Sequence, residues 1–93
     1  MKNQKSTMRY YDFEGDTYEE VLKNAKKLGY KFLIRWINSD ESWVWFQTTY
    51  NKAKKFAIDL YMKEKRETNI ELAKQYYCEY IDIIEVSDEV KNI

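Results

Sequence analysis

The centre of the chain reads RWINSDESWVWFQTTY, residues 35–50, and holds all three tryptophans. Apolar, β-branched and aromatic residues fill the segments on either side of its polar middle, a composition typical of extended strands. The polar segment NSDES between them is rich in residues that favour turns. We therefore predict an antiparallel hairpin whose strands cover residues 30–38 and 43–50.

The hairpin loop determines which side chains share a face, because side chains alternate along a strand and a one-residue shift exchanges the faces. A loop with an even number of residues places all three tryptophans on one buried face with Phe32 and Ile34. An odd number leaves a core of Phe32, Ile34, Trp36, Val44 and Phe46. It then places Trp43, Trp45, Gln47 and Arg35 together on the opposite face. We favour the odd loop because it gives a more compact apolar core. Both registers are kept as alternatives.

On either side of the hairpin, helix-capping residues and glycines indicate where the other elements begin and end. Residues 8–14 are aromatic and partly alternating, which indicates a strand, and Asp16 with Glu19 resembles the start of a helix that ends before Gly29. After the hairpin, Asn51 or Thr49 is expected to cap a second helix with an apolar stripe. Residues 69–80 are compatible with helix or strand. We favour a short helix that leads into a final strand over 80–86.

This order of elements is the βαββαβ pattern, which predicts an α+β domain of ferredoxin-like topology. Such a domain has a four-stranded antiparallel sheet with its helices on one face, so that the other face is open to solvent. The domain is expected to cover residues 8–87. Residues 1–7 are predicted to be a disordered arm, and residues 88–93 a frayed tail.

Composition restricts the setting in which the protein works. A chain of 93 residues has the size of one domain, and no apolar run approaches the roughly 20 residues of a membrane helix. No apolar segment follows the lysines of MKNQKST, and the chain has one cysteine, so we expect a cytoplasmic protein. Lys, Asn, Ile, Tyr and Phe, which AT-rich codons encode, are abundant, so the composition indicates an AT-rich genome, such as that of a low-GC bacterium, a phage or a plasmid.

The residues that most enzymes use are scarce. The sequence has no histidine, one cysteine and only two glycines. Histidine is the commonest general base and metal ligand near neutral pH, and glycine-rich loops bind phosphates and dinucleotides. We therefore expect no enzymatic activity, no metal and no cofactor.

Three surfaces remain as candidates for partner binding. The first is the aromatic sheet face of the odd register, with Trp43, Trp45, Arg35 and Gln47. The second is an acidic final strand, because residues 75–90 contain no base; its carboxylates are Glu79, Asp82, Glu85, Asp88 and Glu89. The third is an anion site at the start of the second helix, formed by Lys52, Lys54 and Lys55.

These surfaces predict a small protein-binding module that changes the activity of its partner. A phage or mobile-element inhibitor of a bacterial enzyme is a special case suggested by the amino-acid composition. The alternative from another class is a single-stranded RNA or DNA binder that stacks bases on Trp43 and Trp45. Zero net charge weakens that alternative, because phosphate binding depends on excess positive charge. A homodimeric structural protein is the third hypothesis.

Overall fold

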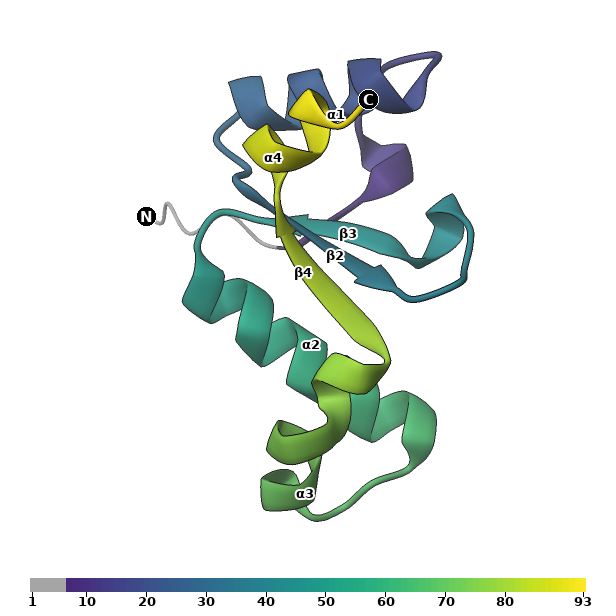
Figure 1. The fold of residues 1–93 in the computed structure, drawn as a ribbon, viewed down its shortest axis with the longest axis vertical. Helices are drawn as coiled ribbons and strands as arrows, with labels where there is room; N and C mark the ends of the chain where they lie inside the picture. The colour runs from purple at the N-terminus through teal and green to yellow at the C-terminus, as the bar shows by residue number, and fades with distance from the viewer. Residues whose placement is uncertain (1–6) are drawn as a thin grey trace.

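The chain folds into a four-stranded antiparallel sheet that lies between two layers of helices (Figure 1). This computed structural model describes residues 7–93. The strands are β1 (Met8–Arg9), β2 (Phe32–Trp36), β3 (Val44–Gln47) and β4 (Ile81–Glu85). The α-helices are α1 (Tyr18–Lys27), α2 (Tyr50–Lys65), α3 (Ile70–Tyr76) and α4 (Val86–Lys91). Three short 3-10 helices are η1 (Tyr10–Asp12), η2 (Glu41–Trp43) and η3 (Tyr77–Glu79). Apart from Thr7, the predicted arm over 1–7 lies outside the described residues.

Local side-chain chemistry sets the helix starts. The Thr17 hydroxyl accepts from the Glu20 N–H at 3.2 Å and the Glu20 carboxylate accepts from the Thr17 N–H at 3.2 Å, which is a capping box. The box begins one residue later than the predicted Asp16. Gly15 precedes it at φ +142°, where an added Cβ would lie 2.9 Å from the Val21 nitrogen, so this turn requires glycine. For α2, the Thr49 hydroxyl accepts from the Lys52 N–H, which makes Thr49 the N-cap.

The hairpin has the even register. Phe32 pairs with Gln47 and Ile34 with Trp45, whereas Leu33 and Arg35 pair with Phe46 and Val44 on the other face. The preference for an odd loop was therefore wrong. It assumed that one sheet face is open to solvent and must be distinguished from a core face. In this fold both faces are covered, so both can be apolar.

The strand order is β1-β3-β2-β4, so a ferredoxin-like order is not confirmed. Helices cover both faces, and the prediction that they share one face was wrong (Figure 1). α1 connects β1 to β2, and α2 connects β3 to β4, and both connections move in the same direction across the sheet. The strands that start them, β1 and β3, run in opposite directions. Two crossovers of the same hand then place their helices on opposite faces.

Each face of the sheet has its own core. On the first face, Leu33, Val44 and Phe46 pack against α1 and α4 in a cluster that also contains Val21, Leu22, Ala25 and Val86. On the second, Ile34 and Ile81 pack against α2 and α3 in a cluster that also contains Ala53, Ala57, Leu60, Tyr61, Ala73 and Tyr77. The sheet is therefore the shared middle layer of a three-layer molecule.

The C-terminal segments are more ordered than expected. Residues 86–91 form α4, and Val86 is fully buried, so the prediction of a frayed tail over 88–93 was wrong for most of that segment. Residues 70–79 are helical in α3 and η3, and the Asn69 side chain accepts from the N–H groups of Glu71 and Leu72 at the start of α3. Within residues 7–93, no helix is both long and apolar enough to cross a membrane.

Candidate functional site

The tryptophans form a row of aromatic contacts between the sheet and α2. Ring centroids lie 5.3 Å apart for Phe56 and Trp45, 5.9 Å for Trp45 and Trp43, and 5.6 Å for Trp43 and Trp36. The row continues to Tyr80, 6.0 Å from Trp36. All three tryptophans are half-buried against the α2-side core, so their main role is packing.

The predicted aromatic sheet surface is not brought together. Arg35 lies on the opposite face from Trp43 and Trp45, under α1 and α4. Gln47 is on the tryptophan face but is only 4% exposed, and its amide is used internally. Its nitrogen donates to the Thr7 hydroxyl at 2.9 Å, and its oxygen accepts from the Thr48 N–H at 2.7 Å. What remains accessible is an open hollow of about 240 Å³, lined by Arg9, Ser42, Trp43, Trp45, Leu60, Lys63 and Glu64.

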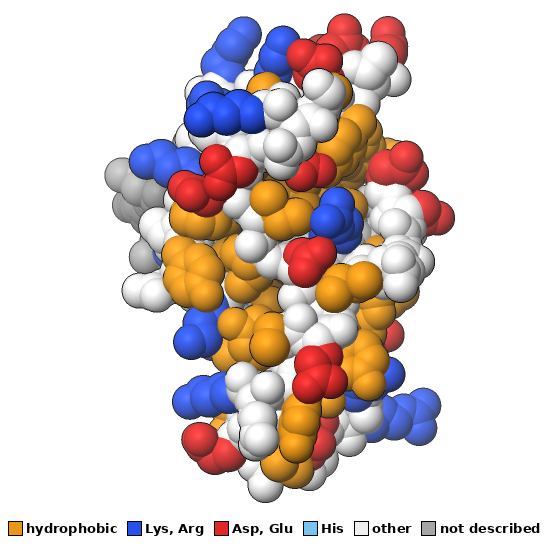
Figure 2. All heavy atoms as spheres, in the orientation of Figure 1, with side chains coloured by type: hydrophobic (Ala, Val, Ile, Leu, Met, Phe, Trp, Pro, Cys, Tyr) orange, Lys and Arg blue, Asp and Glu red, His pale blue; other side chains and the backbone are white. Residues whose placement is uncertain are grey.

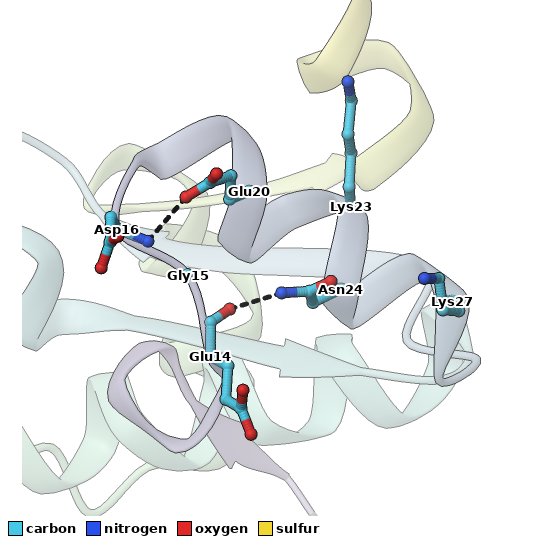
Figure 3. A pocket seen from close by; sticks show the side chains of 7 residues that line it. All are labelled: Glu14, Gly15, Asp16, Glu20, Lys23, Asn24 and Lys27. Atoms are coloured by element: carbon cyan, nitrogen blue, oxygen red, sulfur yellow. Dashed lines mark hydrogen bonds between the residues drawn. The ribbon is translucent and has the colours of Figure 1, made fainter.

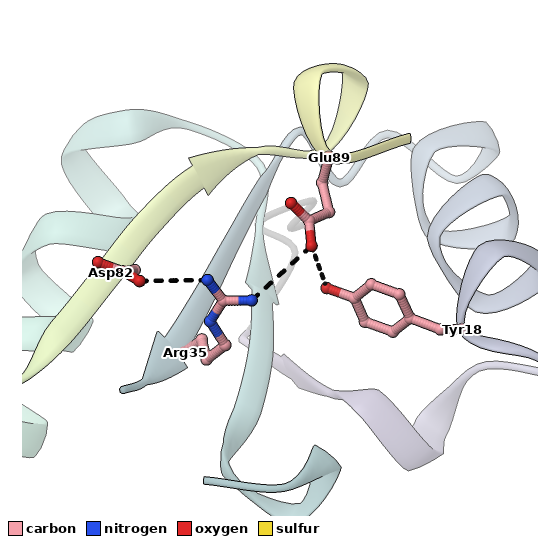
Figure 4. Close-up of polar contacts among 4 residues, drawn as sticks. All are labelled: Tyr18, Arg35, Asp82 and Glu89. Atoms are coloured by element: carbon pink, nitrogen blue, oxygen red, sulfur yellow. Dashed lines mark hydrogen bonds and ion pairs between the residues drawn. The ribbon is translucent and has the colours of Figure 1, made fainter. Parts of the chain in front are cut away.

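Arg35 instead organises a polar network on the first face (Figure 4). One guanidinium nitrogen lies 3.2 Å from Asp82 Oδ2 on β4, and the other lies 3.7 Å from Glu89 Oε2 on α4. The Tyr18 hydroxyl of α1 donates to the same Glu89 oxygen at 2.9 Å. Burial and the bond to Glu89 raise the pKa of Tyr18, because both disfavour the phenolate. The network joins α1, β2, β4 and α4.

The network leaves negative charge on the β4 side of the sheet. Arg35 supplies one positive charge to two carboxylates, so the group carries a net charge of −1. The side chains of Arg35 and Asp82 are 33% and 40% exposed, so water screens their pair only in part. Glu79, Glu85 and Asp88 are exposed at the ends of β4. The five predicted acidic residues thus divide into two that Arg35 holds and three that face solvent.

β4 forms one border of the sheet and pairs only with β2 among the described strands. Figure 1 shows it crossing the face nearest the viewer, between the two helix layers. Figure 2 shows hydrophobic side chains on this face, interrupted by acidic and basic ones. We call the strand and the exposed carboxylates Glu79, Glu85 and Asp88 the β4 surface. It is the part of the described chain where unpaired backbone and excess negative charge coincide.

The predicted anion site is brought together only in part. Lys54 and Lys55 line an open hollow of about 260 Å³ with Asn51, Ile58, Asp59, Ile70 and Lys74, whereas Lys52 does not contribute to it. The Lys55 ammonium lies 3.7 Å from the Asp59 carboxylate, one helical turn further along, in an exposed ion pair. Two of the three predicted lysines therefore line one hollow, together with Lys74 of α3.

A larger hollow of about 590 Å³ lies beside α1 (Figure 3). Its polar groups have structural tasks: Glu20 accepts from the Asp16 N–H at 2.7 Å, and the Asn24 amide donates to the Glu14 carbonyl at 2.6 Å. In the part of the chain that the structure describes, no group of three His, Cys, Asp or Glu side chains is arranged to hold a metal. Glu20 and Asn24 therefore fix the start of α1 and the turn that precedes it.

Comparisons with protein-family models, curated proteins and solved structures find no match. The assignment of a functional site therefore rests on the geometry of the described residues alone. Sequence reasoning missed Tyr18 as a partner of Glu89, and nothing in the sequence connects residues 71 positions apart. It also missed the position of Arg35, although a lone base between Ile34 and Trp36 in an apolar strand does indicate a paired charge.

Proposed function

We propose that this protein is a small protein-binding module, without catalytic activity of its own, that modulates a partner bound at the β4 surface. The observation that supports it best is the coincidence, at β4, of an unpaired strand edge with exposed carboxylates. Unpaired edges are templates for association, and excess charge selects the partner and speeds encounter. Binding would change the activity of the partner, either by covering its functional surface or by altering its conformation.

The six groups whose pKa is shifted are poorly suited to acid–base catalysis near neutral pH. Burial raises the pKa of five tyrosines (Tyr10, Tyr18, Tyr30, Tyr61 and Tyr77), which keeps them protonated at neutral pH. Hydrogen bonds from Ser42 lower the pKa of Asp40 and keep it ionised. Each of these shifts moves away from neutral pH, whereas a general acid or base works best when its pKa is near the working pH.

The experiment is affinity capture from lysates of low-GC bacteria, followed by binding measurements with the purified captured protein. Reversing the three exposed charges, Glu79→Lys, Glu85→Lys and Asp88→Lys, should abolish capture. The matched control reverses three exposed carboxylates elsewhere, Glu14→Lys, Glu64→Lys and Glu71→Lys, and should retain it. Capture that survives the β4 reversal, or that fails equally in the control, would contradict the proposed surface.

A second candidate function is single-stranded nucleic-acid binding at the hollow beside the tryptophans. It is favoured by the accessible parts of Trp43 and Trp45 next to the cations Arg9 and Lys63. Its test is a titration with single-stranded oligonucleotides at roughly 20–50 mM salt, where electrostatic binding is strongest. Tryptophan quenching that disappears with added salt would support it. Unchanged fluorescence would contradict nucleic-acid binding at this hollow, and protein binding would be the remaining proposal.

A further inference from the structure

The outer side of β4 presents hydrogen-bonding groups in a regular spacing. The Val86 N–H donates to the Lys31 carbonyl, and the Ile37 N–H donates to the Tyr80 carbonyl. The β2–β4 register keeps the same parity between these two bonds. In an antiparallel pair, alternate residues point their backbone groups toward the partner strand. The backbone N–H groups of Ile81, Ile83 and Glu85 therefore point away from β2, to the open side.

This edge is long enough to accept another strand. β4 has five residues, whereas β1, on the opposite border, has two. Next to the edge, Ile83 lies on the α2 side and Ile84 on the α1 side, and both are half-buried. An added strand would cover the remaining exposed parts of both side chains, one on each face. Backbone pairing and apolar cover therefore favour the same occupant, an extended segment.

Charge determines which extended segment suits the edge. Asp82 is half-exposed beside the edge, and its neighbour Arg35 is shared with Glu89. A second copy of the chain, paired about Ile83, would place Asp82 opposite Ile84 and Ile81 opposite Glu85. That arrangement gathers carboxylates from both copies without a new cation. A Lys or Arg on an added strand beside Asp82 would instead form a row of alternating charges with Asp82 and Arg35.

We propose that β4 accepts an extended basic segment of a partner protein as a fifth strand, with a Lys or Arg beside Asp82. This inference rests on the proposed protein-binding function and specifies how the β4 surface recognises its ligand. The backbone of Ile81, Ile83 and Glu85 supplies the pairing, and Asp82 with the flanking carboxylates selects a basic sequence. The same carboxylates keep a second copy of the chain off the edge.

The direct test uses a blocked nine-residue peptide of alternating Lys and Val, with hydrogen exchange read residue by residue by NMR. The peptide should slow exchange of the Ile83 and Glu85 amides at least about tenfold, because they gain hydrogen-bond acceptors. The Asp82 and Ile84 amides, which already face β2, should change little. A peptide of alternating Glu and Val should leave all four amides unchanged.

Variants separate backbone pairing from side-chain contact. Ile83→Pro removes an N–H that faces the open side, so it should abolish peptide binding while the β2–β4 bonds remain. Ile83→Val keeps that N–H and should bind the peptide. Asp82→Asn should weaken binding roughly three- to fivefold, as expected for a half-exposed ion pair. Should the proline variant fail to fold, the comparison of the two peptides on the unaltered protein still decides the question.

Four results would overturn strand addition. The first is no binding of the Lys–Val peptide. The second is binding without protection of Ile83 and Glu85. The third is a dimer in sedimentation whose edge amides are already protected, which would make a second copy the occupant. The fourth is a captured partner whose binding depends on the exposed carboxylates but tolerates Ile83→Pro; the protein-binding function would then stand alone. Capture that ignores the exposed carboxylates overturns the proposed function itself.

Discussion

Arg35 lies between two carboxylates that would otherwise face each other without a cation. Arg35→Met retains the aliphatic volume and removes the charge, so we expect the free energy of unfolding to fall by about 1 kcal/mol, a value discounted for partial exposure. Urea unfolding at pH 7 measures it, with Lys31→Met as the exposed control. At about 1 M salt, where the Debye length is about 3 Å, the difference should shrink. An unchanged difference would mean that packing dominates.

Tyr18 links stability to alkaline pH. Its pKa is raised from 10.0 in the folded protein, so its contribution to stability is complete below pH 10 and is lost as pH rises toward the folded pKa. Tyr18→Phe removes the bond to Glu89 and should cost about 1 kcal/mol at pH 7. The same variant should lose less stability than the unaltered protein between pH 9 and 11, as roughly bracketed by the ordinary tyrosine pKa. Parallel pH curves in urea unfolding would contradict this role.

At the scale of elements, α4 acts as a clamp on the first face. It contributes buried Val86 and the Glu89 carboxylate that holds Arg35 and Tyr18. Removing residues 86–93 should reduce the free energy of unfolding by about 2–4 kcal/mol, from lost burial, two lost hydrogen bonds (Tyr18–Glu89 and Val86–Lys31) and the lost Arg35–Glu89 ion pair. Removing only residues 92–93 is the control and should cost little. Equal thermal midpoints for the two truncations would mean that α4 contributes no stability and that residues 86–93 behave as a tail.

The sequence predicted most elements and few of their contacts. Gly29 marked the end of α1 correctly, and Thr49, one of two expected caps, begins α2, because caps depend on local chemistry. Asp16 failed by one residue because both Asp16 and Thr17 are good caps with a glutamate three positions later. The hairpin parity failed although FLIRWI and WVWF are nearly continuous apolar runs, which is the pattern of strands covered on both faces. The partner of β4 depends on long-range packing, which no local pattern records.

At the scale of the whole molecule, the two cores share one sheet, and all three tryptophans report on only one of them. Leu33→Ala and Ile34→Ala each remove a fully buried side chain, on the α1 side and the α2 side respectively, and should each cost about 2–5 kcal/mol. In urea, the tryptophan and far-ultraviolet circular dichroism transitions should coincide for both variants, since the shared sheet couples the layers. For Leu33→Ala, circular dichroism lost before tryptophan signal would indicate two independent layers.

The open border of the sheet also has a consequence for solubility. Asp82 is the residue that interrupts the apolar run Ile81–Ile84, on an edge that no other strand of residues 7–93 pairs with. Asp82→Val would create four consecutive β-branched residues, the composition of segments that stack into fibrils. We expect this variant to form thioflavin-positive aggregates during expression or storage, whereas Asp88→Val, on α4, should stay dispersed. One carboxylate would then act as a gatekeeper against fibre growth, and its loss would be seen first as low yield.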